Sequence, residues 1–90
     1  MNHKDAIKQI ARHYGFRHQA IKTAEECSEL AAAMNKLVNG EGGRNAVVEE
    51  MADVQIMLRQ MQYLMRIDHS EISAMVDYKV NRQLGRMKES

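Results

Sequence analysis

The sequence predicts an all-α fold, and three observations support this. Apolar residues recur at three- and four-residue steps, the period of an α-helix, along most of the 90 residues. No segment alternates apolar and polar residues in the manner of a half-buried strand. The chain has no Pro and no Trp, with one Phe and three Tyr, which disfavours a β-sheet core. Its length suits a single domain covering residues 1–90.

The first two helices are expected on either side of Gly15. One runs from about Asn2 to Tyr14, and the next from about Phe16 to Val38. Asn39 and Gly40 follow, and both residue types suit the left-handed position that ends a helix. The second helix has a clear apolar face, formed by Ala20, Cys27, Leu30, Ala31, Met34, Leu37 and Val38.

Two more helices follow a Gly-rich connector. The third is expected from about Asn45 to Ile67. The fourth opens at Asp68, where Glu71 three residues later predicts a capping box, and continues to about Lys88. Together the four segments predict a four-helix bundle.

The third helix is apolar on two sides. One stripe is expected to face the core and comprises Val47, Met51, Val54, Leu58, Met61 and Met65. The other lies about 160° away on a helical wheel and comprises Ala52, Ile56, Tyr63 and Ile67. We expect another subunit to cover the second side, which predicts a homodimer or homotetramer. The alternative is that the first or last helix of the same chain covers it.

Composition narrows the class of protein. A net charge of +1 gives no global attraction to nucleic acid or to a membrane. The single Cys27 excludes an internal disulfide and fits a reducing compartment. The sequence shows neither the apolar run of a signal peptide nor one of about 18 residues that would cross a bilayer. A cytoplasmic protein is therefore expected.

Two pairs of acids give the strongest indication of chemistry. Glu26 and Glu29 share one face of the second helix, and Glu50 and Asp53 share one face of the third. In a hairpin of these helices Glu26 comes level with Asp53, and Glu29 with Glu50. Four carboxylates in one place repel each other unless cations neutralise them, and hard oxygen ligands suit Mg²⁺, Mn²⁺ or Ca²⁺. The alternative is that these acids are solvated surface residues at the edge of the core, with ion-pair partners on their own helix such as Lys22.

The motif residues resemble a known family. Lys22, the segment Glu25-Glu26-Cys27-Ser28-Glu29 and the segment Glu50-Met51-Ala52-Asp53 are similar to the signature of the all-α NTP pyrophosphohydrolase (MazG-like) superfamily. The resemblance covers nearly the whole chain and implies a short, single-domain, MazG-like four-helix bundle.

The resemblance also implies an activity. Members hydrolyse a nucleoside triphosphate to the monophosphate and pyrophosphate with Mg²⁺ or Mn²⁺, often to remove unwanted nucleotides. Carried over to this chain, the metal ligands are Glu26, Glu29, Glu50 and Asp53. Glu25 and Glu29 are both candidates for the general base, and the sequence does not choose between them.

A nucleotide substrate would also need positively charged side chains to bind its phosphates and aromatic side chains to contact its base. Lys79, Arg82 and Arg86 form one stripe on the last helix and, with Lys22, are candidates to bind the phosphates. Phe16 and His18 are candidates to contact the base. No Gly-rich phosphate loop and no Glu-x-x-His motif is present, which argues against a P-loop enzyme and a di-iron bundle.

Two other functions remain open from the sequence. Phosphoribosyl-ATP pyrophosphohydrolase has similar acidic helices and cleaves the same kind of bond. A non-catalytic helical interaction module would keep the fold without turning over a substrate.

Overall fold

The computed structural model describes residues 2–89, and in this range every regular element is a helix. The helices are α1 (His3–Val38), α2 (Arg44–Leu64) and α3 (His69–Glu89). The all-α prediction is confirmed. None of the described helices is long and apolar enough to span a membrane.

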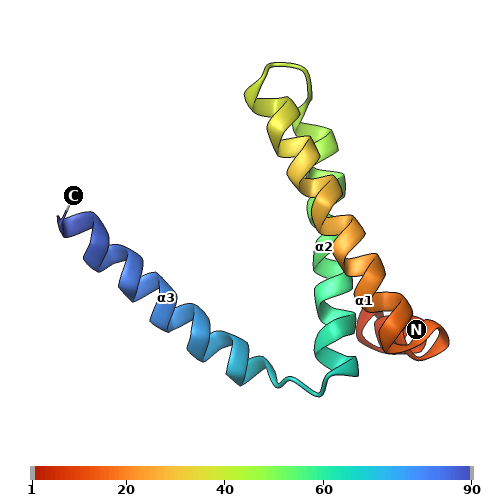
Figure 1. Cartoon of the computed structure of the whole chain (residues 1–90). Helices are drawn as coiled ribbons and strands as arrows, with labels where there is room; N and C mark the ends of the chain where they lie inside the picture. Colours follow the sequence, from red (N-terminus) through yellow and green to blue (C-terminus); the bar gives the residue numbers. More distant parts are fainter. Residues whose placement is uncertain (1, 90) are drawn as a thin grey trace.

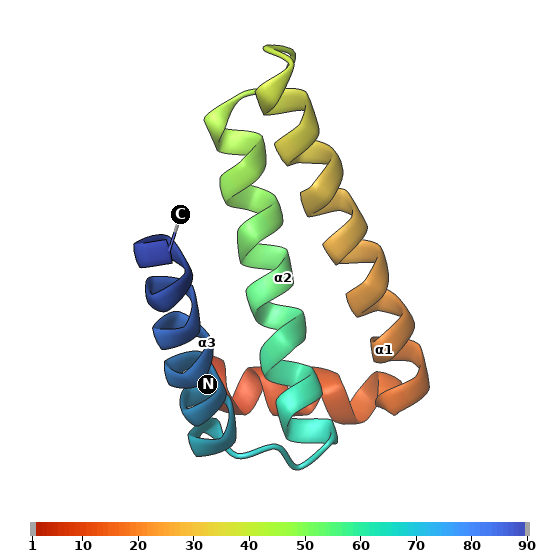
Figure 2. The same cartoon turned by 60° about the vertical axis from the view of Figure 1, so that its left-hand side comes forward.

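Helix α1 contains both of the helices expected on either side of Gly15. They are continuous but sharply kinked, because Gly15 has a φ of 83° and a ψ of 171°. Only glycine adopts this backbone conformation without strain. The segment before the kink therefore lies across the base of the molecule, while the segment after it runs alongside α2 (Figure 2).

The connector between α1 and α2 ends the first helix as the sequence predicts. Gly40 has a φ of 75°, and its N–H donates to the carbonyl of Leu37 at 3.1 Å. The N–H of Glu41 donates to the carbonyl of Lys36 at 2.8 Å. These two bonds form a Schellman motif, which satisfies carbonyls that the helix end leaves open.

The antiparallel hairpin of α1 and α2 is the main packing unit (Figure 1). Its buried apolar side chains are few: Ile7, Ala11, Val47 and Met57. Polar side chains share the interface, since Gln19, Glu26 and Gln60 are also buried. A core with this many polar groups gives the fold limited stability. It also places hydrogen-bonding and ionisable side chains in the interface between α1 and α2, which is called the seam below.

The expected core stripe of the third helix is only partly correct. Val47 is buried, but Met51, Leu58 and Met65 are about half exposed, at 46%, 49% and 53%. The seam instead runs along a neighbouring line of α2 that includes Met57 and Gln60. Periodicity locates the apolar side of a helix, but it does not set the helix rotation against its partner.

The second apolar side of α2 is partly covered within the chain. Arg12 donates from Nη1 to the hydroxyl of Tyr63 at 2.9 Å, and the Lys8 ammonium lies 5.7 Å from the Tyr63 ring centroid. The segment of α1 before the kink thus covers Tyr63, which is the alternative raised above. Ile56 remains 42% exposed.

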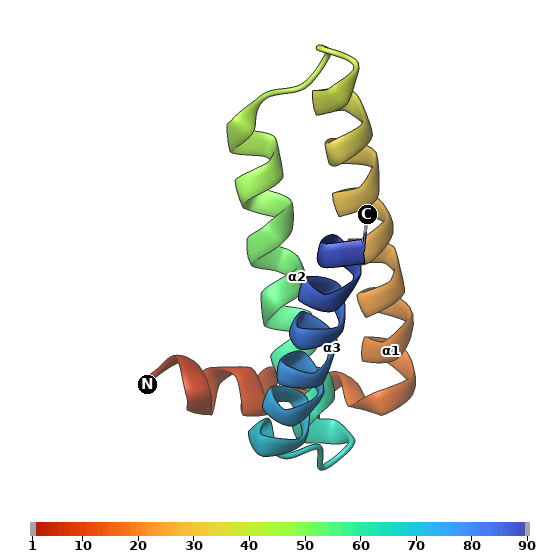
Figure 3. The same cartoon turned by 90° about the vertical axis from the view of Figure 1, so that its left-hand side faces the viewer.

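Helix α3 extends away from the hairpin, so the expected four-helix bundle is not seen in the single chain (Figure 1). In Figure 3, where the left-hand side of Figure 1 faces the viewer, α3 lies in front of the hairpin. None of its described residues is buried. The Asp68 N–H donates to Glu71 Oε2 at 2.8 Å, which confirms the Glu71 half of the predicted capping box. Helix α2 ends at Leu64, three residues earlier than expected, because Arg66 adopts a left-handed conformation with a φ of 55°.

Candidate metal centre

Three of the four predicted metal ligands come together across the hairpin. Helix α1 supplies Glu26 and Glu29, and α2 supplies Glu50, with one carboxylate oxygen from each lying within 4.8 Å of the others. The i, i+3 spacing places both α1 acids toward α2. The expected pairing of Glu29 with Glu50 is seen, because Glu29 is both the main charge acting on Glu50 and a hydrogen-bond partner.

Asp53 does not join this three-acid cluster. It follows Glu50 by one turn, and its side chain is exposed. Its charge still acts on Glu50. Asp53 is exposed although it lies on the same side of α2 as Met57 and Gln60, about 40° and 20° away around the helix. It therefore borders the cluster rather than completing it.

Two oxygens of the cluster are buried and lack a hydrogen-bond partner among the described residues: Oε2 of Glu26 and Oε2 of Glu50. Glu26 as a whole is only 7% exposed. A carboxylate oxygen removed from water without a donor is costly, and a bound cation compensates for that loss. This observation separates the cluster from an ordinary solvated acidic rim.

The donor set fits a hard divalent cation. All three candidate ligands offer carboxylate oxygens, and no described His or Cys belongs to the cluster. Mg²⁺ and Mn²⁺ favour oxygen ligands, and Mg²⁺ commonly keeps several waters beside one or two protein carboxylates. Glu26, Glu29 and Glu50 therefore suit such an ion without further protein ligands.

Lys22 leaves one oxygen of Glu26 open to a cation. Its Nζ lies 3.3 Å from Oε1 of Glu26 and 3.7 Å from Oε2 of Glu25. The hydrogen bond to Glu26, and then the charge of that carboxylate, raise the pKa of Lys22. Lys22 thus remains cationic and binds Oε1 of Glu26, while Oε2 stays unpartnered.

Burial and neighbouring acids raise the pKa of Glu50. Loss of solvent is the largest cause, followed by the negative charges of Glu29, Asp53 and Glu26 and by a hydrogen bond with Glu29. All of these causes disfavour the charged form of Glu50 in the absence of a cation. A bound divalent cation would reverse that balance, which couples metal binding to proton release.

This raised pKa predicts a pH dependence of stability without metal. The folded state keeps a proton on Glu50 at pH values where the unfolded chain has lost it. The stabilising contribution is therefore complete below the ordinary pKa of 4.5 and is lost as the pH rises through the folded value.

Thermal denaturation in a chelator, from pH 4 to pH 8, measures this contribution. Wild-type protein should lose more stability over the range than Glu50→Gln, with Glu49→Gln on the exposed neighbouring position as the control. If the stability of wild type and of Glu50→Gln fell equally steeply with pH, Glu50 would not be the cause of the pH dependence.

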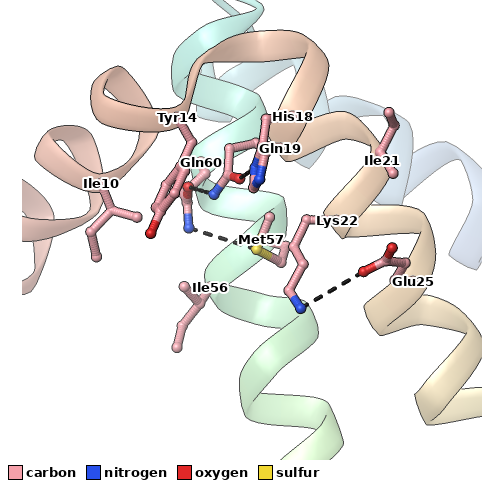
Figure 4. A pocket seen from close by; sticks show the side chains of 10 residues that line it. All are labelled: Ile10, Tyr14, His18, Gln19, Ile21, Lys22, Glu25, Ile56, Met57 and Gln60. Atoms are coloured by element: carbon pink, nitrogen blue, oxygen red, sulfur yellow. Dashed lines mark hydrogen bonds and ion pairs between the residues drawn. The ribbon is translucent and has the colours of Figure 1, made fainter.

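A pocket of about 590 Å³ adjoins the cluster, between the two segments of α1 and the middle of α2 (Figure 4). Glu25 and Lys22 form its border toward the acids, and the kink at Gly15 brings the first segment to its other side. Ten residues line it: Ile10, Tyr14, His18, Gln19, Ile21, Lys22, Glu25, Ile56, Met57 and Gln60.

Two features of the pocket suit a flat polar ligand. The Tyr14 and His18 rings stack at 4.7 Å with an interplanar angle of 17°. Behind them, Gln19 Nε2 donates to Gln60 Oε1 at 2.7 Å, and His18 Nδ1 lies 2.6 Å from Gln19 Oε1.

The predicted catalytic and substrate-binding residues outside the cluster do not all lie near it. Glu25, His18 and Lys22 line the pocket. Phe16 is 53% exposed and is not among the lining residues. Lys79, Arg82 and Arg86 lie on α3, which extends away from the acids, so a single chain does not bring them to the cluster (Figure 1).

The buried pair Gln19 and Gln60 was not identified from the sequence. A signal was present, because these two residues obey the same hairpin register that pairs Glu29 with Glu50. Two long polar side chains facing each other in a helical seam are expected to hydrogen-bond. The register could therefore have located the pair.

Comparisons with protein-family models, with curated proteins and with solved structures found no match to this chain. The resemblance to the MazG-like superfamily therefore depends on the motif residues alone. The geometry of the acidic cluster and the adjoining pocket provides the independent basis for a functional proposal.

Proposed function

We propose that this protein is a Mg²⁺-dependent pyrophosphohydrolase that converts a nucleoside triphosphate to the monophosphate and pyrophosphate. One observation carries the proposal: Glu26, Glu29 and Glu50 converge within 4.8 Å, and two buried oxygens of the cluster lack a protein partner. Such a site suits a divalent cation, and the ligand class that most often shares a carboxylate-bound Mg²⁺ is a phosphate chain.

The position of each residue suggests its role in metal binding or in proton transfer. Glu26, Glu29 and Glu50 would hold the cation, which when bound neutralises phosphate charge and makes a bound water more acidic. Lys22 fixes Glu26 through Oε1. Glu25 is exposed, lines the pocket and stands outside the cluster, so it is better placed than Glu29 to accept the proton of the attacking water.

The pocket supports the nucleoside half of the proposal. Tyr14 and His18 offer ring surfaces beside the polar pair Gln19 and Gln60 (Figure 4). A base needs both stacking area and polar edges. Lys22 lines the pocket and contacts Glu26 of the cluster, which would let a nucleoside in the pocket extend its phosphates toward the acids.

A nucleotide panel tests the proposed activity. Canonical, deoxy and damaged triphosphates are incubated with the protein, with Mg²⁺ or with chelator, and release of pyrophosphate is measured. At least one nucleotide should be cleaved only with Mg²⁺. Binding of Mg²⁺ without turnover of any nucleotide would favour the non-catalytic helical module instead.

A further inference from the structure

The single chain is much more open than a compact protein of its size. Its radius of gyration is 16.0 Å, whereas a compact domain of this length has about 12 Å. Its accessible surface is 7265 Å² for a mass of 10.3 kDa, whereas a folded monomer of that mass exposes about 5,400 Å². About 1,900 Å² of surface is therefore in excess for each chain.

Helix α3 accounts for one part of that surface. It is 21 residues long, and none of its described residues is buried. Yet it is amphipathic, with a stripe of side chains that are 38–53% exposed: Ile72, Met75, Val76, Val80 and Leu84. An isolated helix of this length is marginal in water, and an apolar stripe of this kind normally packs against a partner.

The hairpin carries a second open apolar surface, on the side away from the acids. On α1, Met34 and Val38 lie about 140° and 180° from Glu29 around the helix. On α2, Met51 and Leu58 lie about 160° and 140° from Asp53. These four side chains and Met65 are 40–83% exposed. The single Cys27 is exposed on the same side, about 160° from Glu29.

Local hydrogen bonds hold α3 away from the hairpin of its own chain. At the end of α2, the Ile67 N–H donates to the Gln62 carbonyl at 2.9 Å and the Arg66 N–H to the Tyr63 carbonyl at 3.3 Å, a Schellman motif. The Asp68–Glu71 cap follows at once. Both ends of the link are thus fixed by residues within it, which sets the direction in which α3 leaves.

We propose that a second copy of this chain covers both surfaces: α3 of each protomer packs its apolar stripe on the open hairpin face of the other. The two surfaces are present on every chain, so the exchange closes by two-fold symmetry. The excess of about 1,900 Å² on each chain corresponds to about 3,800 Å² in total, within the range of obligate homodimers. The inference does not depend on the proposed activity.

Sedimentation equilibrium tests the assembly. Wild-type protein should sediment at about twice the monomer mass of 10.3 kDa at micromolar concentrations. Val76→Glu should weaken association at least about 100-fold, because it places a charge in the exchanged interface. Ala74→Glu, an exposed position about 160° from Val76, is the control and should remain dimeric. A monomeric wild type, or a Val76→Glu protein that dimerises as tightly as wild type, would overturn the proposal.

A disulfide trap separates exchange between chains from folding back within one chain. Cysteine is placed in turn at Ile72, Val76 and Val80, and each variant is oxidised with Cys27 as the partner. The expected product is a covalent dimer, in at least one variant, beyond the level given by wild-type Cys27 and by Ala74→Cys. An intrachain disulfide, or no bond above these controls in all three variants, would contradict the exchange.

Discussion

Glu50→Gln is expected to lower Mg²⁺-dependent turnover by about 10²–10³-fold, the loss typical of removing one preorganised charge-stabilising group from an active site. Glu50 contributes one of the three converging carboxylates and one of the two buried oxygens without a partner. Glutamine keeps the size of the side chain but removes the negative charge. The measurement is kcat/KM with the best nucleotide from the panel.

Glu49→Gln is the matched control, because it makes the same chemical change one position earlier, on an exposed side chain outside the cluster. It should retain nearly full activity. If Glu50→Gln turned over substrate as fast as Glu49→Gln, the cluster would not be the catalytic centre. Glu29→Gln should resemble Glu50→Gln, since Glu29 belongs to the same cluster.

Mg²⁺ is expected to raise the melting temperature of the nucleotide-free protein. At a concentration about ten times the dissociation constant, binding to the native state alone adds about 1.4 kcal/mol. For a domain of this size that corresponds to about 6–11 °C. The ion would reduce the mutual repulsion of Glu26, Glu29 and Glu50. It would also give a partner to the two buried oxygens that lack one, Oε2 of Glu26 and Oε2 of Glu50.

The same titration on Glu50→Gln separates specific binding from general ionic effects. This variant should melt higher than wild type in chelator, because repulsion with Glu29, Asp53 and Glu26 is removed. It should then gain little from Mg²⁺. Asp53→Asn should keep most of the Mg²⁺ response, since Asp53 lies outside the cluster. An equal Mg²⁺ response in wild type and Glu50→Gln would place the ion elsewhere.

Local signals in the sequence predicted the helices and most of their ends. Gly15 and Gly40 take left-handed conformations where the periodic pattern breaks, and Glu71 caps α3 as expected. These features depend on a few neighbouring residues, so they can be inferred without tertiary information. The pairing of Glu29 with Glu50 also followed, because an antiparallel hairpin with a short connector allows only a narrow range of registers.

The rotation of the helices about their own axes was not predictable in the same way. The seam of α2 includes Gln60, whereas the stripe that contains Leu58 is half exposed. An apolar pattern alone would have buried Leu58. Hydrogen bonding between Gln19 and Gln60, at 2.7 Å, fixes a rotation that hydrophobic periodicity does not indicate.

The placement of α3 depends on more than its own sequence. The four-helix bundle expected from the sequence would pack this helix on the others, yet the capped link at Arg66 and Asp68 directs it away from the hairpin. Lys79 and Arg82 are consequently separated from the acids that they were expected to assist. An apolar pattern indicates that one side of a helix packs against another surface. It does not indicate whether that surface belongs to the same chain or to another copy.

The products of nucleotide cleavage are the decisive test of the proposed pyrophosphohydrolase activity. ³¹P NMR of a triphosphate turned over in Mg²⁺ distinguishes cleavage next to the α-phosphate from loss of the terminal phosphate. The expected products are nucleoside monophosphate and pyrophosphate in equal amounts, with no cleavage in chelator and strongly reduced cleavage by Glu50→Gln. Nucleoside diphosphate with orthophosphate, or products that form equally well with Glu50→Gln, would contradict it.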